Sequence, residues 1–197
     1  MVGVEIKFDA SKIKKIQTAL DGVGLKKKSD ALSQSFRVAG IFLEARLKEK
    51  VGGDILNVRS GVLRNSIGSK VFFKSAKDIS VVVGSGVRSG ARTKYANIHE
   101  VGGTIVPVNK QWLTIPFPAA LTSAGVLRAS ARQWENTFIA KHIIFQKRGK
   151  TIVPLFALKK SVKIPARRYM NKTLTEHGGK VFGIIMDSIK KQIAKAV

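Results

Sequence analysis

The hydrophobic periodicities of the chain predict an α+β fold: an antiparallel sheet of hairpins with N-terminal helices and a long C-terminal helix packed on one face. Three observations carry this prediction. Two stretches with helical spacing stand near the N-terminus, strand-like pairs fill the middle, and apolar residues recur at helical spacing close to the C-terminus. The whole chain, residues 1–197, is expected to form a single α+β domain.

The N-terminal part predicts one strand and two helices. Residues 4–8 alternate apolar and polar side chains, as a half-buried strand does. Asp9 or Ser11 can cap a first helix, which the glycines at 22 and 24 end. A second helix is expected from about residue 29 to 50, where Gly52-Gly53 stops it. Its apolar stripe is Leu32, Phe36, Ala39, Leu43 and Leu47.

A β-hairpin is expected next, because residues 67–73 and 79–83 are rich in Val, Ile and Phe and flank a turn at 75–78. Residues 84–94 contain three glycines and three basic residues, which is typical of a flexible basic loop. A short helical turn is expected at 95–101, ended by a Gly-Gly pair.

The next segment predicts a second hairpin, between residues 104–108 and 112–117. Residues 119–136 show no clear period, and we expect a loop or short-helix insertion there. A peripheral hairpin is expected over residues 137–158. Pro154 interrupts its second strand and cannot donate to a ladder, so this pair is expected to be peripheral or bent.

The C-terminal segment predicts one long helix from Tyr169 to Ala196. Gly178-Gly179 can bend or split this helix, because each glycine costs about 1 kcal/mol in a helix interior. Its apolar face is expected to consist of Val181, Ile185, Ile189 and Ile193.

The strongest compositional signal is the charge, because 36 Lys and Arg stand against 12 acids and give a net charge of +24. Residues 141–197 hold 14 of these basic residues and two acids. Such an imbalance predicts a polyanion or acidic proteins as neighbours, or else a solvated basic face. The chain has no cysteine. It also shows neither a signal-like apolar core nor a membrane-length apolar run, so we expect synthesis and folding in a cytoplasm and no membrane contact.

The residues predict no enzyme, no cofactor, no metal and no catalytic group. Gly149-Lys150-Thr151 resembles the end of a phosphate loop, but the glycine required five residues earlier is Ile144. His99-Glu100 would need a second histidine at position 103 for a zinc helix, and Gly103 stands there. For Glu100 we expect a salt bridge or a helix-end charge rather than catalysis.

Three sequence blocks carry a family resemblance. They are Ser60-Gly61-Val62-Leu63-Arg64-Asn65-Ser66-Ile67, Tyr95-Ala96-Asn97-Ile98-His99-Glu100-Val101-Gly102-Gly103, and a hydrophobic–basic run from Pro154 that ends in Ile164-Pro165-Ala166-Arg167. In their order and spacing the blocks resemble the tail-completion, or virion-morphogenesis, proteins of tailed bacteriophages. Arg168 stands where that family often has a proline.

The resemblance implies a structural virion protein at the head–tail joint or the tail end. Such a subunit forms a homo-oligomeric ring, a hexamer in the family, which completes the tail and connects it to the head around the DNA channel. Its partners would be other copies, neighbouring phage neck and tail proteins, and genomic DNA through non-specific contacts. It would be located in the virion and assembled in the host cytoplasm. Whether its position is that of a tail terminator, a tail-completion protein or a head-completion protein stays open.

The candidate subunit-interface or DNA-facing residues are basic and fall in three segments. The alternative function is a non-specific basic nucleic-acid-binding protein, such as a packaging or nucleoid-type factor; a hydrolase with an unrecognised site is the weaker third class. The candidates are Arg88, Arg92, Lys94, Lys147, Arg148, Lys150, Lys159, Lys163, Arg167 and Arg168.

Overall fold

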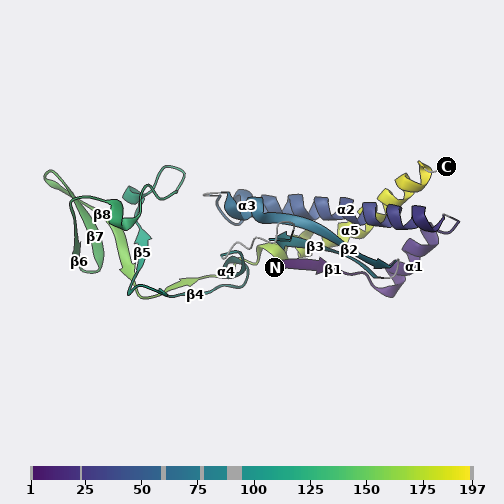
Figure 1. Ribbon diagram of the computed structural model, residues 1–197, viewed down its shortest axis with the longest axis horizontal. Helices are drawn as coiled ribbons and strands as arrows, with labels where there is room; N and C mark the ends of the chain where they lie inside the picture. The colour runs from purple at the N-terminus through teal and green to yellow at the C-terminus, as the bar shows by residue number, and fades with distance from the viewer. Residues whose placement is uncertain (1, 23, 59–60, 76–77, 88–94, 196–197) are drawn as a thin grey trace. The chain divides into compact units, whose positions relative to one another are not determined.

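A computed structural model describes residues 2–22, 24–58, 61–75, 78–87 and 95–195 of the chain. The fold is mixed α+β with antiparallel sheets, N-terminal helices and a long C-terminal helix, as the sequence predicts (Figure 1). A single domain was the expectation, but the chain forms two compact units. Unit 1 comprises residues 1–101 and 167–197, and unit 2 comprises residues 102–166.

Unit 1 contains one three-stranded antiparallel sheet in the order β1-β3-β2. β1 (Val2–Ile6) and β2 (Ile67–Ser75) both pair with the central strand β3 (Asp78–Ser85). The predicted hairpin of β2 and β3 is therefore confirmed, and β1 starts two residues earlier than the pattern indicates. The remaining elements of unit 1 are helical: α1 (Ala10–Ala19), α2 (Leu25–Glu49), the π-helical turn η1 (Lys50–Asp54), α3 (Val62–Ser66), α4 (Ala96–Val101) and α5 (Tyr169–Ala194).

The core of unit 1 lies between one face of this sheet and the helices α2 and α5. Val81 and Val83 on β3 are buried in the same cluster as Phe36 on α2 and Ile185 on α5. Asp9 accepts a hydrogen bond from the Lys12 amide at 2.9 Å and caps α1, as predicted. The predicted long C-terminal helix is confirmed, and α5 runs through Gly178-Gly179 without being split there.

The long helix α2 lies unusually close to the sheet at Gly40. A Cβ atom at this position would be 2.8 Å from Val81 Cγ2 and 3.1 Å from Ser69 Cβ. The missing side chain thus lets the helix backbone approach two neighbouring strands. Gly183 in α5 is also helical, but a Cβ atom there would meet nothing within 4 Å.

Unit 2 consists of a four-stranded antiparallel sheet in the order β5-β8-β7-β6 and a two-stranded pair, β4-β9. Two short 3-10 helices lie between β5 and β6, within the segment predicted as a loop or short-helix insertion. The elements are β4 (Gly103–Ile105), β5 (Leu113–Pro116), η2 (Pro118–Ala120), η3 (Ala131–Gln133), β6 (Thr137–Ala140), β7 (Ile143–Arg148), β8 (Thr151–Lys159) and β9 (Val162–Ile164).

The predicted hairpin between residues 104–108 and 112–117 is wrong. β4 pairs with β9, and β5 pairs with β8, so both segments lie along the same side of one long antiparallel ribbon. Residues 106–112 form an excursion from that side, opposite the two residues that separate β8 from β9. Local alternation of apolar and polar residues predicted the two strands. The strand that each one pairs with lies about fifty residues away in the sequence, so no local pattern indicates it.

The predicted peripheral hairpin at 137–158 holds the two inner strands of the sheet, β7 and β8. Lys141 and His142 both have positive φ, 47° and 61°, and form a two-residue turn that splits the predicted first strand into β6 and β7. Pro154 is accommodated because the register shifts between Ile144 and Phe145, which leaves an extra residue in β8. The strand is therefore bulged, while its position is central.

Replacing Gly40 by alanine is expected to destabilise unit 1, and replacing Gly183 by alanine to stabilise it. Alanine relieves the backbone-entropy cost of a helical glycine by about 0.5–1 kcal/mol, but at Gly40 the new methyl group overpacks the helix–sheet interface at a cost of about 1–3 kcal/mol. Chemical denaturation of the two variants measures both signs. Equal shifts in the same direction would contradict the close approach at Gly40.

Candidate functional site

A single carboxylate caps the C-terminal helix from far away in the sequence. Glu100, at the end of α4, accepts hydrogen bonds from the backbone amides of Met170 at 2.8 Å and Asn171 at 3.1 Å. The first turn of α5 contains no acidic residue, and the residue before it, Arg168, provides no side-chain cap. Glu100 therefore satisfies two of the unpaired amides at the positive end of the α5 dipole.

The same helix start is held by a buried tyrosine. Tyr169 is fully buried and donates its hydroxyl proton to the carbonyl oxygen of Ala96 at 3.2 Å. Burial, and then the nearby Glu100 carboxylate, raise the pKa of Tyr169 well above its usual range, so the phenol stays protonated and remains a donor. Thr173, one turn further along, donates to the Tyr169 carbonyl at 2.8 Å.

Two backbone hydrogen bonds join the places where the chain leaves and re-enters unit 1. The Arg167 amide donates to the His99 carbonyl at 2.7 Å, and the Arg168 amide donates to the Glu100 carbonyl at 3.1 Å. Arg168 has a φ of 52°. A proline fixes φ near −65° and has no amide proton, so the family's proline does not fit the backbone found here.

Unit 2 shows a matching close approach at its own two ends. Gly102 has a φ of 75°, and a Cβ atom there would lie 2.8 Å from the Ala166 nitrogen. β4 and β9 begin and end at this point, with Gly103 opposite Ile164. The second and third resemblance blocks therefore contribute to both sides of the point where the chain leaves and re-enters unit 1. We call the residues of unit 1 at this point the junction (residues 95–101 and 167–171).

The first resemblance block lies elsewhere in unit 1 and is also structural. Gly61, with a φ of 71°, precedes α3, and Leu63 and Ile67 are buried. Ser66 Oγ donates to the Leu63 carbonyl at 2.7 Å and lies 2.8 Å from Ser85 Oγ. This block starts β2 and fixes it beside β3. Its first residue, Ser60, lies outside the described residues.

The hydrogen bonds of the junction serve the start of α5 and the backbone beside it. Burial, and then the Arg167 guanidinium, lower the pKa of His99, so its ring is neutral near pH 7. Both carboxylate oxygens of Glu100 are already used by α5 amides. Among the described residues, no three His, Asp or Glu side chains are grouped so that they could hold a metal ion. Glu100 has the helix-end position that the sequence analysis expects.

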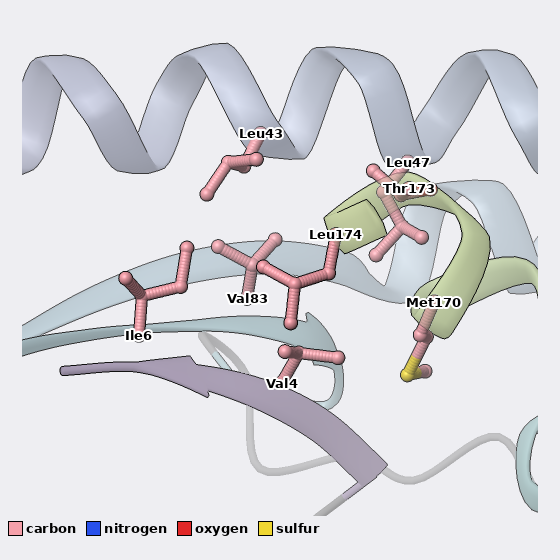
Figure 2. Close-up of a pocket in the computed structure, with 8 residues that line it drawn as sticks. All are labelled: Val4, Ile6, Leu43, Leu47, Val83, Met170, Thr173 and Leu174. Atoms are coloured by element: carbon pink, nitrogen blue, oxygen red, sulfur yellow. The ribbon is translucent and has the colours of Figure 1, made fainter. Parts of the chain in front are cut away.

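A small apolar cavity lies in the core of unit 1 between α2, β1, β3 and the start of α5 (Figure 2). It has a volume of about 20 Å³, room for about one water molecule. Thr173 is the one polar residue in its lining, and its hydroxyl already donates within α5. Such a space offers no group that could bind or orient a substrate.

The predicted basic residues fall into separate places. Arg88, Arg92 and Lys94 lie outside the described residues, as does most of the predicted 84–94 loop. Arg167 and Arg168 belong to the junction in unit 1. The other candidates are exposed in unit 2: Lys147, Arg148 and Lys150 around the β7–β8 turn, Lys159 at the end of β8 and Lys163 on β9.

The basic side chains of unit 2 have few acids near them. Residues 102–166 contain ten Lys and Arg and a single acid, Glu135. The ion pairs found in the described part of the chain join residues of unit 1. Lys160 instead lies over the Trp112 ring, 5.5 Å from its centroid, and His142 lies 4.8 Å from the same ring. Local charges in unit 2 therefore go largely uncompensated.

One face of the four-stranded sheet is covered and the other is open. Ile144, Leu155 and Phe156 are buried on the covered face, together with Ala120 from η2 and beside Trp134. The register places nine apolar residues on the opposite face, which we call the open face, and none of them is buried. They are Leu113, Ile115, Phe138, Ala140, Ile143, Phe145, Ile152, Pro154 and Ala157.

The open face was missed by the sequence reasoning, which selected basic residues alone. One register row, Ile115–Ala157–Ile143–Ala140, crosses all four strands without a polar residue. Phe138 and Phe145 stack with their centroids 5.5 Å apart in the next row. Alternation within each strand carried part of this signal, but the order of the strands was needed to bring the residues onto one surface.

Comparison of the chain with protein-family models, with curated proteins and with solved structures finds no match. None of the helices in the described residues is long and apolar enough to span a membrane.

Replacing Glu100 by alanine is expected to destabilise unit 1 by about 1–2 kcal/mol, because two amides of α5 lose their acceptor and the helix dipole loses its counter-charge. Amide exchange at Met170 and Asn171 should accelerate. The matched control is Glu49→Ala, which removes an exposed carboxylate paired with Arg46 at 2.8 Å and should cost under about 1 kcal/mol. Equal losses in both variants would contradict the capping role.

Proposed function

We propose that this chain is a ring-forming structural subunit of a tailed-phage virion, at the head–tail joint or the tail end. The family resemblance supports the biological setting, because two of its three blocks supply the two sides of the junction. The single observation that carries the assembly role is the open face of unit 2. An apolar face of this extent on a small module is typical of a surface that other subunits cover.

The composition of unit 2 supports an interface role. Its buried hydrophobic cluster consists of four residues, Ala120, Ile144, Leu155 and Phe156. Several large side chains on or beside the sheet stay exposed, among them Ile139 at 66%, Ile152 at 57% and, in the 106–112 excursion, Val108 at 91%. A module with little interior of its own and much exposed apolar surface gains stability by association.

A ring follows when each subunit uses two different surfaces, one for each neighbour, and the rotation between copies closes. In this proposal unit 1 provides a rigid body, and unit 2 provides contacts with other copies and with neighbouring phage neck and tail proteins. The basic residues would then face acidic proteins or the DNA inside the ring. A hexamer is the state that the resemblance implies.

The double variant Phe138→Glu/Ile152→Glu is expected to abolish oligomers while leaving the fold intact, because it places charge on the open face at two exposed positions. Light scattering after size exclusion measures the oligomer, electron microscopy shows whether it is a ring, and circular dichroism checks the fold. Val126→Glu, an exposed apolar position between η2 and η3, is the matched control. A monodisperse monomer of the unaltered chain at high concentration would refute the proposal.

A second candidate function is non-specific binding of nucleic acid, which the uncompensated charge of unit 2 favours. Cations without acidic partners bind phosphates by releasing counterions, so the affinity falls steeply with salt. The β7–β8 turn is the densest described group in unit 2, with Lys147, Arg148 and Lys150 within four residues. This function is compatible with a ring around DNA and also with a protein that acts alone.

The triple variant Lys147→Gln/Arg148→Gln/Lys150→Gln is expected to weaken duplex DNA binding and to reduce the slope of log K against log salt by up to about 3. Lys180→Gln/Lys190→Gln/Lys191→Gln on α5 removes the same charge and serves as the control. Fluorescence anisotropy at several salt concentrations measures both. Equal weakening by the two variants would show that net charge alone matters and that the turn is no binding surface.

A further inference from the structure

We infer that neighbouring copies join edge to edge through the four-stranded sheet of unit 2, with β6 of one copy pairing antiparallel to β5 of the next. This inference rests on the proposed ring and adds to the open face a second contact between copies, made by the edges of the same sheet.

The β6 edge is unprotected. All four residues of β6, Thr137 to Ala140, are exposed, and none is charged or a proline. Natural sheets usually guard an edge with lysine, proline or a bulge. The Lys147 amide donates to the Asn136 carbonyl, so the alternation along the strand turns residues 138 and 140 toward β7. The amides and carbonyls of Thr137 and Ile139 therefore point away from the sheet.

The β5 edge presents the complementary groups. The Phe117 amide donates to the Leu155 carbonyl, so residues 113 and 115 turn toward β8, and Thr114 and Pro116 point outward. Thr114 offers a donor and an acceptor, and Pro116 offers an acceptor alone. Pairing Thr114 with Ile139 of the next copy brings Pro116 opposite Thr137. This register forms three hydrogen bonds and does not require the proline, which has no amide proton, to donate one.

Because the sheet has four strands, the same contact can repeat from each copy to the next. In a sheet of four antiparallel strands the two edges run in opposite directions, so the same rotation always brings β6 antiparallel to β5. The outward residues of both edges also have their side chains on the same face of the sheet, the one that carries Ile144 and Phe156. The open faces of successive copies therefore lie on one continuous surface.

Charge favours this edge over other places for contact between copies. Each copy has a net charge of +24, so most surfaces bring cations against cations. β5 and β6 contain no charged residue. Two copies of the chain can meet at these edges without placing a lysine directly opposite another one.

The cysteine-free chain allows a direct test by cross-linking. Hydrogen-bonded antiparallel partners have Cα atoms about 5.5 Å apart, within the range that a disulfide spans. The double variant Thr114→Cys/Ile139→Cys is expected to form a ladder of covalent oligomers on mild oxidation. A mixture of the two single variants should stop at covalent dimers, and each single variant alone should stay uncross-linked. Thr114→Cys/Phe138→Cys is the control, because Phe138 faces the opposite side of the sheet.

Each alternative outcome is distinct. Dimers of the Ile139→Cys single variant would show a two-fold pairing of β6 with itself and would overturn the inference. Oligomers by light scattering without a ladder would overturn the edge contact and leave the ring proposal standing. Equal ladders from the Phe138 control would show random collisions and would also refute the register. If the unaltered chain is a monomer, both the ring and this contact fail.

Discussion

The capping of α5 by Glu100 is the interaction on which the organisation of the chain depends. α5 contributes Val181, Ile185 and Ile189 to the core of unit 1. In the sequence, however, its start is separated from α4 by all the residues of unit 2. Neither the helix nor the residue before it supplies a side-chain cap. The carboxylate at the end of α4 thus sets where α5 begins, and the buried Tyr169 hydroxyl adds a second bond to α4. A helix end without such partners would leave amides unsatisfied.

Units 1 and 2 differ in how much apolar surface they bury and in how their charges are paired. Unit 1 buries a continuous cluster of helix and sheet residues and pairs many of its charges. Unit 2 buries four hydrophobic residues in its own cluster, keeps one sheet face open and has a single acid for ten basic residues. The first unit therefore covers most of its apolar sheet face with its own helices, whereas the second keeps an apolar sheet face exposed. The proposed assembly role rests on this difference between the two units.

Element types could be read from the sequence better than pairings. Alternation and helical spacing located β2, β3, α1, α2, α4 and α5, because these signals are local. The partner of β4 is not local, so residues 104–108 and 112–117 were joined wrongly. The turn at Lys141-His142 lacks the glycine that marks most two-residue hairpins, and its positive φ values were invisible in advance. Glu100 was recognised as a helix-end charge, but which helix it caps depends on tertiary structure.

The backbone bond between His99 and Arg167 has a consequence for how such a protein can change. Both of its atoms belong to unit 1, so the cut ends of that unit are held together without any contribution from the residues between them. A segment inserted between two points that already touch can be lengthened, shortened or exchanged at little entropic cost to its host. Unit 1 can then remain the same while unit 2 changes in length or sequence. Surfaces of unit 2 can change in this way without substitutions in the hydrophobic core of unit 1.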